Sequence, residues 1–206
     1  MSAPVPGLAR FQAELRSHLQ HKNAVFSPQI NDVLTEVIQF SSASLRDGLR
    51  VALTRLSANA EAWPNRTFIE LCEAIVEHHI RNVTTEEREL FGKSLIEAYM
   101  HFAGPQYVFE PVKKTRFMRS LRRHGAKGLA STFLSLHLFN MVCREICDEV
   151  ASRMPNQQAY EMYMYCIEGL CRDVVAHAIE LANGEMDERW APAVVGAIEA
   201  QLFRKV

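Results

Sequence analysis

The stretch LASTFLSLHLFNMVCREICDEVASR, residues 129–153, has the most apolar helical pattern in the chain. One face carries Leu129, Phe133, Leu136, Cys143, Ile146 and Val150, and the neighbouring face carries Leu134, Leu138, Met141 and Val142. His137 and Asn140 interrupt the middle. A helix that is apolar over more than half of its circumference must be covered on several sides. The stretch therefore predicts a buried central helix around which the fold is built.

A basic stretch, KKTRFMRSLRR at residues 113–123, directly precedes this helix. The sequence HGAKG at residues 124–128 predicts a break between the two. No Asp or Glu occurs in the 34 residues from Pro111 to Arg144, so the cations are predicted to lack carboxylate partners at i,i+4. Phe117, Met118 and Leu121 give the basic stretch an apolar anchor. The predicted contact residues are Lys113, Lys114, Arg116, Arg119, Arg122, Arg123 and Lys127.

The rest of the chain also shows helical spacing of apolar residues, interrupted by turn residues. Helices are predicted at about residues 8–21, 27–40, 45–59, 67–81, 84–103, 113–123, 129–153, 157–181 and 187–203. Ser41–Ser44 is predicted to be a turn, and Thr84 with Glu87 a capping box. Residues 1–7 are predicted to be a flexible lead.

No stretch shows the sustained alternation of a half-buried strand, so the fold class predicted is all-α. About nine helices joined by short turns favour antiparallel pairs in a HEAT-like stack, with an irregular helical bundle as the alternative. At 206 residues the chain fits a single domain spanning residues 1–206.

Composition favours a cytoplasmic or nuclear protein. The start of the chain lacks the basic and apolar segments of a signal peptide, and no run reaches the roughly 18 apolar residues of a membrane span. The five cysteines lie in apolar helical patterns, which predicts reduced thiols. The net charge is −1, but residues 145–190 hold ten acidic and three basic residues, so the charge is unevenly distributed. Such polarity favours an oriented contact with a partner.

Motifs of catalysis and metal binding are weak. No His is preceded by Glu at the Glu-x-x-His spacing of di-metal bundles, and the Cys-x-x-Cys knuckles of zinc sites are absent. Four cysteines (Cys143, Cys147, Cys166 and Cys171) could in principle hold zinc, but buried small side chains explain them better. No phosphate loop or nucleophile elbow occurs. We therefore expect no cofactor and no metal, and an enzyme is disfavoured.

Several segments resemble the middle domain of eukaryotic initiation factor 4G and its relatives. They are Leu45–Leu53 (LRDGLRVAL), Thr67–Cys72 (TFIELC), Phe91–Leu95 (FGKSL), Thr132–Phe139 (TFLSLHLF) and Tyr163–Val174. Many members of that family carry a Gly-Glu pair in the central helix, where this chain has Ser135-Leu136. The resemblance implies HEAT-like helix pairs and a non-enzymatic scaffold in translation or RNA metabolism. It also implies a DEAD-box helicase or another factor as the protein partner, together with RNA.

Two functional hypotheses follow. The first is the interaction scaffold, which contacts a protein partner or RNA through the basic stretch. The second is a helical-bundle enzyme or small-ligand carrier with a pocket near His137 on the central helix. A lone histidine in such a helix is more often a hydrogen-bonded core residue, so the scaffold is preferred.

Overall fold

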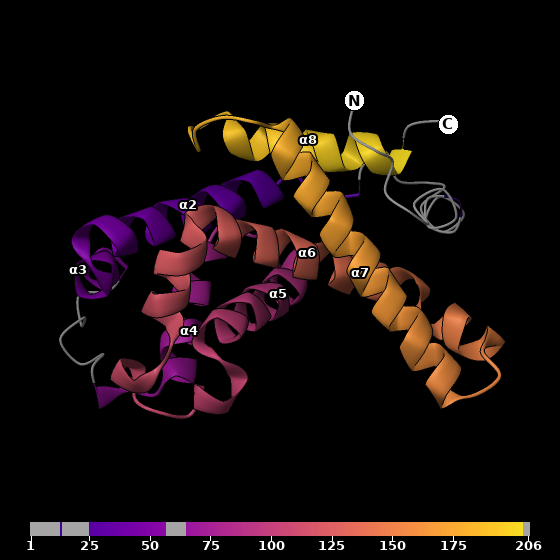
Figure 1. The fold of residues 1–206 in the computed structure, drawn as a ribbon, viewed down its shortest axis with the longest axis horizontal. Coiled ribbons are helices and arrows are strands. Elements are labelled where there is room, and N and C mark those ends of the chain that lie inside the picture. Colours follow the sequence, from indigo (N-terminus) through magenta and orange to yellow (C-terminus); the bar gives the residue numbers. More distant parts are fainter. Residues whose placement is uncertain (1–12, 14–24, 57–64, 204–206) are drawn as a thin grey trace. The chain divides into compact units, whose positions relative to one another are not determined.

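A computed structural model of the chain describes residue 13, residues 25–56 and residues 65–203. The described residues form seven α-helices and two short 3-10 helices (Figure 1). Their bounds are α2 Ile30–Asp47, α3 Leu49–Thr54, α4 Phe68–His79, α5 Thr85–Ala103, η2 Pro105–Tyr107, η3 Val112–Lys114, α6 Phe117–Arg153, α7 Gln157–Leu181 and α8 Trp190–Phe203. The chain divides into two compact units: Met1–Ile30 with Leu134–Val206 form unit 1, and Asn31–Phe133 form unit 2.

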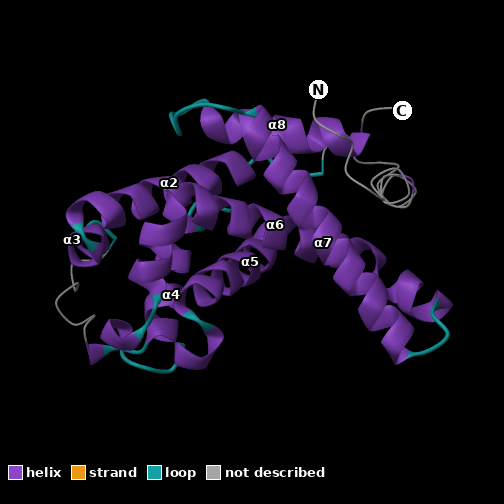
Figure 2. Ribbon diagram, viewed as in Figure 1, coloured by secondary structure: helices purple, strands orange, loops and turns teal. Residues whose placement is uncertain are grey.

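Helices make up all the regular structure in the described part of the chain, which contains no strand (Figure 2). An isolated antiparallel bridge joins Thr67 to Pro111. The all-α prediction is confirmed. The count of nine helices is not confirmed, because the described residues hold seven; their arrangement in HEAT-like pairs stays a prediction. The predicted lead at residues 1–7 and helix at residues 8–21 fall outside what the structure describes, apart from residue 13.

Helix α2 continues through Ser41 to Ser44, where the sequence predicted a turn. The Ser41 hydroxyl donates to the Val37 carbonyl oxygen at 2.6 Å, so the helix's own backbone satisfies this buried serine. Gly48 then turns the chain into α3 with a φ of 88°, a region that glycine enters without steric strain. The predicted helix at residues 45–59 is therefore the end of α2 followed by the short α3; residues 57–59 lie outside the described ranges.

Helix α4 begins with a capping box at Thr67. The Glu70 carboxylate accepts from the Thr67 backbone N–H at 2.8 Å, and the Thr67 side chain accepts from the Glu70 backbone N–H. The Thr67 hydroxyl also donates to the Glu70 carboxylate at 2.8 Å, and this bond, together with the one from the Thr67 backbone N–H, lowers the pKa of Glu70. The capping box predicted at Thr84 is not formed: Thr84 is the N-cap residue of α5, but no side-chain capping hydrogen bond is made there.

The core of unit 2 is a cluster of aromatic rings that joins four helices. Phe68 of α4 and Tyr99 of α5 lie 5.5 and 5.8 Å from the ring of Phe117, the first residue of α6. Phe40 of α2 contacts Tyr99 edge-on at 6.1 Å. All four rings are buried, and full burial of each such side chain contributes about 1.5–3 kcal/mol. This cluster fixes where α6 begins.

Helix α6 contains the break that the sequence predicted. The helix runs from Phe117 to Arg153, but Gly125 has a φ of 69° and a ψ of 179°, which is not helical. The predicted basic and central helices are therefore two segments of one element, kinked at Gly125. Positive φ is open to glycine at no steric cost, which explains the residue type at this position. The helix predicted at residues 113–123 begins later than expected. Lys113 and Lys114 lie in η3, and Arg116 directly precedes α6.

Unit 1 is built from the later part of α6 together with α7 and α8. The Asn156 side chain caps α7 by accepting from the Ala159 backbone N–H at 2.8 Å. The Gln201 side chain of α8 donates to the Val174 carbonyl oxygen of α7 at 3.2 Å. The predicted helix at residues 157–181 has the bounds observed for α7, whereas the last helix begins at Trp190 instead of residue 187.

The five cysteines are free thiols, and burial raises the pKa of Cys72 and Cys171. None of the described helices combines the length and the apolar character that a membrane crossing requires.

Candidate functional site

The chain between α5 and α6 holds the basic stretch in place. Gly104 ends α5 with a φ of 84°. The backbone N–H groups of Phe68 and Ile69, at the start of α4, then donate to the carbonyl oxygens of Glu110 and Val108 at 3.0 and 2.8 Å. The Arg116 N–H returns to the Ala103 carbonyl oxygen at 3.2 Å. These backbone hydrogen bonds hold the connection against α4 and α5 at both ends. The backbone from which its side chains extend is therefore fixed in position.

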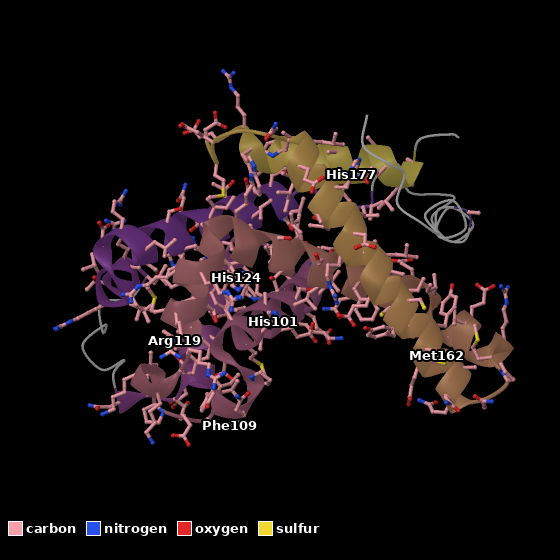
Figure 3. All side chains as sticks on the ribbon, in the orientation of Figure 1. His101, Phe109, Arg119, His124, Met162 and His177 are labelled. Carbon is pink, nitrogen blue, oxygen red and sulfur yellow. The ribbon has the colours of Figure 1, made fainter. Side chains whose placement is uncertain are left out.

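The first segment of α6 is anchored by its apolar residues. Phe117 and Leu121 are buried, and Met118 is half-buried. Residues of a helix recur at about 100° per position, so Arg119, Arg122 and Arg123 fall on the other side from this anchor. All three arginines are exposed, and Arg119 is labelled in Figure 3.

Two of the seven predicted contact residues have partners within unit 2. Lys114 Nζ lies 2.9 Å from Glu110 Oε2, which is an i,i+4 ion pair that the sequence argument missed. The Arg116 guanidinium stacks on the Tyr107 ring at 5.2 Å and donates to its hydroxyl at 3.3 Å. These two residues are therefore less available than the sequence suggested.

The other five cations form no ion pair or hydrogen bond with any residue that the structure describes. We call them the basic surface: Lys113, Arg119, Arg122, Arg123 and Lys127. Lys127 is half-buried and follows the kink, whereas the other four are exposed. Binding by these residues stays a prediction.

An exposed aromatic side chain lies four residues before Lys113, the first cation of the basic surface, and sequence reasoning overlooked it. Phe109 is 78% exposed, which is unusual for so large an apolar side chain (Figure 3). It is four residues before Lys113, so the two Cα atoms are at most about 14 Å apart. Aromatic residues at positions 107 and 109, directly before a run of cations, are a signal that the sequence did contain.

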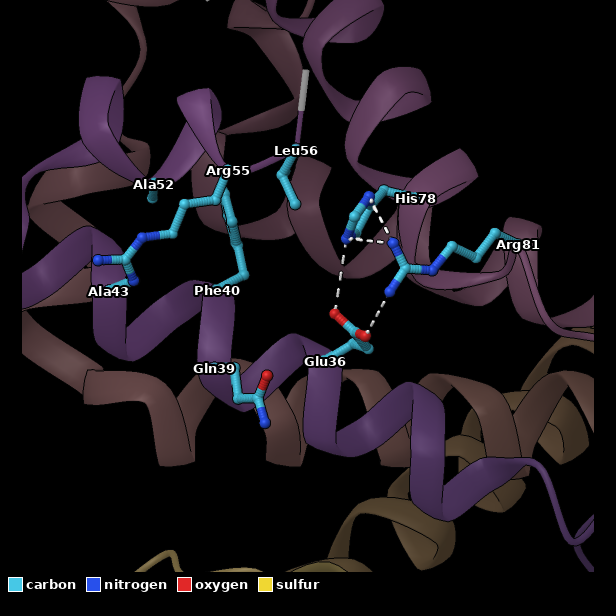
Figure 4. A pocket seen from close by; sticks show the side chains of 9 residues that line it. All are labelled: Glu36, Gln39, Phe40, Ala43, Ala52, Arg55, Leu56, His78 and Arg81. Atoms are coloured by element: carbon cyan, nitrogen blue, oxygen red, sulfur yellow. Dashed lines mark hydrogen bonds and ion pairs between the residues drawn. The ribbon is translucent and has the colours of Figure 1, made fainter. Parts of the chain in front are cut away.

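A second candidate is a cavity of about 300 Å³ in unit 2 (Figure 4). Its polar lining comes from α2, from α4 and from Arg55 and Arg81, which follow α3 and α4, and its apolar lining includes Phe40 and Leu56. The Glu36 carboxylate accepts from Arg81 at 3.2 Å and lies 3.7 Å from His78 Nε2. Burial lowers the pKa of His78, the Arg81 charge lowers it further, and Glu36 opposes both. Since Arg55 also pairs with Asp47 at 2.9 Å, the charges around this cavity are already matched.

The described residues offer no metal-binding group. No three His, Cys, Asp or Glu side chains come together among them in a way that could hold an ion. Glu77, which the sequence places near His78 on one helix, pairs instead with Arg88 at 2.6 Å.

His137 is a core residue of unit 1. Its side chain is 1% exposed and stacks on the Phe26 ring at 6.0 Å. Burial lowers its pKa to about 3, so the imidazole is neutral at physiological pH. His137 is not among the residues that line the 300 Å³ cavity of unit 2.

Helix α7 exposes a small apolar face. Met162 and Tyr165 are 64% and 74% exposed and lie one turn apart (Figure 3 labels Met162). Met164, between these two residues in the sequence, is buried in unit 1.

Comparison with known proteins adds no assignment: no family model, no curated protein and no solved structure matches this chain. A function for this chain is therefore inferred from the sequence and the geometry of the basic surface.

Proposed function

We propose that this protein is a non-enzymatic interaction module of RNA metabolism or translation that binds single-stranded RNA through the basic surface. The observation that carries the proposal is a set of five cations without ion pairs among the described residues, preceded by an exposed phenylalanine four residues before the first of them. Proteins that bind single strands combine a positive surface, which follows the phosphates, with aromatic side chains on which bases stack.

Three arginines at the start of α6 repel one another and so destabilise the helix. Arg119 lies one turn from both Arg122 and Arg123, and like charges at this spacing destabilise a helix by about 0.2–0.5 kcal/mol per pair. No acidic residue lies in the first turn to offset them. An anionic ligand would relieve this repulsion, which supports a binding role over a purely solvated face.

Phe109 favours RNA over an acidic protein as the ligand. Stacking of a base on an aromatic side chain contributes about 1–3 kcal/mol, and it needs an exposed ring next to cations. An acidic protein surface would satisfy the arginines but gives no particular reason for the exposed ring. The resemblance to the middle domain of initiation factor 4G supports a scaffold role in which a DEAD-box helicase is the protein partner.

Charge reversal tests the proposal. The triple variant Arg119→Glu, Arg122→Glu and Arg123→Glu is compared with the wild type for binding of a fluorescent single-stranded RNA of about 12 nucleotides without terminal phosphates. Each lost phosphate contact removes about 0.7 from the slope of log K against log salt, so the slope should flatten by about 2. If the wild type and the triple variant bind equally at about 1 M salt, this difference in slope makes the wild type bind a few hundredfold more tightly at about 50 mM salt.

The matched control reverses three exposed arginines of unit 1, Arg153, Arg172 and Arg189, and so changes the net charge equally. The control should keep the affinity within about threefold, because these three arginines are not part of the basic surface and long-range effects of charge are screened at moderate salt. Absence of RNA binding by the wild type, or equal losses in both variants, would overturn the proposal. In the first case, an acidic protein partner becomes the better explanation of the surface.

A further inference from the structure

A small cavity opens between α5 and the first part of α6. Its volume is about 120 Å³, and it is lined by His101, Phe102, Ser120, His124, Gly128 and Thr132. His101 and His124 appear close together in Figure 3, as expected for residues that share one cavity. At about 30 Å³ per molecule, the volume holds about four waters. A phosphate group, with five non-hydrogen atoms, is of similar size, whereas a nucleoside is several times larger.

The lining suits an oxyanion. None of the six lining residues is acidic. Ser120 supplies a hydroxyl, and His101 and His124 supply imidazoles, each of which carries an N–H in either tautomer. The acid one turn before His101 on α5, Glu97, lies 4.0 Å from Lys93, which partly offsets its charge. Hydrogen bonds from such donors to a charged phosphate are stronger than those between neutral groups.

The cavity borders the basic surface. Ser120 and His124 are one turn apart on α6, and the helical spacing places them between the apolar anchor, Phe117 and Leu121, and the cationic side. Arg123 is three residues from Ser120 on that cationic side. A phosphate in the cavity would therefore lie next to the cations that are proposed to hold the RNA backbone.

Glycine at position 128 keeps one wall of the cavity open. A Cβ atom at this position would come within 2.6 Å of the His124 Cβ, a separation that real Cβ atoms do not show. The Thr132 hydroxyl donates to the Gly128 carbonyl oxygen at 3.0 Å, so its proton is already used within the helix. Phe102 closes the base, with its ring 5.9 Å from the His124 ring at 69°.

We propose that this cavity receives the terminal phosphate monoester of an RNA strand bound on the basic surface. A terminal phosphate is joined to the strand by one ester bond, so its three free oxygens can enter a small cavity while the strand continues over the cations. An internal phosphodiester continues in two directions and needs a groove open at both ends. The inference rests on the proposed RNA binding and adds a preference for the strand's phosphorylated end.

The test compares four probes on the full chain: RNA of about 12 nucleotides with a 5′-phosphate, with a 3′-phosphate or with neither, and inorganic phosphate alone. One phosphorylated form should bind about tenfold more tightly than the unphosphorylated strand, the ratio expected from one additional charge-assisted contact. The variant Ser120→Ala with His124→Ala should lose this ratio but keep its affinity for the unphosphorylated strand. The control His177→Ala, a histidine of unit 1, should keep both.

The outcomes separate the two proposals. Equal binding of all three strands by the wild type, with RNA binding intact, overturns the terminal-phosphate site and leaves the proposed function standing. No binding of any strand overturns the proposed function itself. If inorganic phosphate binds but phosphorylation of the strand changes nothing, the cavity takes the free ion and the inference about RNA ends is wrong. A circular dichroism spectrum of each variant establishes that it is folded.

Discussion

Unit 2 contains two histidine–phenylalanine contacts of almost the same geometry in very different surroundings. The rings of Phe40 and His79 lie 5.8 Å apart at 70°, and those of Phe102 and His124 lie 5.9 Å apart at 69°. His79 is 4% exposed, and its Nε2 atom shares a 2.9 Å hydrogen bond with the Tyr99 hydroxyl. His124 is exposed and lines the cavity beside the basic surface.

The contrast teaches that the ring contact does not decide the role of a histidine. Burial lowers the pKa of His79 to about 3, and the nearby His78 and Arg81 act in the same direction. His79 is thus a neutral part of the core with a polar partner inside the fold. His124 makes the same contact as an exposed residue that lines a cavity. Exposure to solvent, and the lack of a hydrogen-bond partner for His124 among the described residues, separate the candidate site from the structural pair.

The largest effect that should distinguish the two contacts is on stability. His79→Ala should lower the free energy of unfolding by about 3 kcal/mol, because it leaves a cavity and removes the partner of the buried Tyr99 hydroxyl. His124→Ala should change it by no more than about 0.5 kcal/mol, as for most surface substitutions. Urea denaturation followed by circular dichroism measures both. Similar losses in the two variants would show that His124 is a core residue and would weaken the case for a site.

A second difference concerns pH. Native His79 stays neutral as the pH falls below 6.5, since burial lowers its pKa to about 3, whereas the unfolded chain takes up a proton there. The unfolded state therefore binds more protons in this window, and stability falls as the pH falls. From pH 7 to pH 5, His79 should account for a loss of about 2 kcal/mol. His137 in unit 1, with a pKa also lowered to about 3 by burial, should contribute in the same sense.

The variants His79→Gln and His124→Gln isolate this contribution. Carboxylates titrate near pH 5 in both, so their effect cancels when the two variants are compared. His79→Gln should lose less stability between pH 7 and pH 5 than His124→Gln, by about 2 kcal/mol. Equal losses would mean that His79 is protonated in the native protein or that its surroundings open at low pH.

The sequence was sufficient for the fold class and for most helix positions. Long amphipathic or apolar stretches predict helices wherever they pack, as the bounds of α7 show. The turn predicted at Ser41–Ser44 was wrong because the segment continues α2, in which the Ser41 hydroxyl donates to the Val37 carbonyl oxygen one turn earlier. Local composition does not reveal such a hydrogen bond before the helix is buried.

The candidate site was partly predictable for a similar reason. A run of cations without neighbouring acids identified the arginines of α6, because helical neighbours are local in sequence. The pairing of Lys114 with Glu110 depends on a connection that is not helical throughout, and it was missed. The cavity brings His101 of α5 together with Ser120 and His124 of α6, and no sequence pattern specifies which faces of two helices meet.

The smallest predicted effect extends the comparison from histidines to arginines. Arg119 lies in the first turn of α6, one turn from Arg122 and Arg123, and has no partner among the described residues. Arg119→Glu replaces two repulsive pairs by attractive ones and places an acid near the positive end of the helix dipole. We expect the free energy of unfolding to rise by about 0.5–1 kcal/mol while the affinity for single-stranded RNA falls.

Arg172 provides the matched opposite case, because its Nη2 atom lies 3.0 Å from Glu168 Oε1 on α7. Arg172→Glu creates an i,i+4 repulsion and should lower the free energy of unfolding by about 0.5 kcal/mol without changing RNA affinity. The same substitution should thus have opposite effects on stability at the two positions, measured by urea denaturation of both variants. If Arg119→Glu destabilises the protein as Arg172→Glu does, Arg119 serves the fold, and the basic surface loses its central residue.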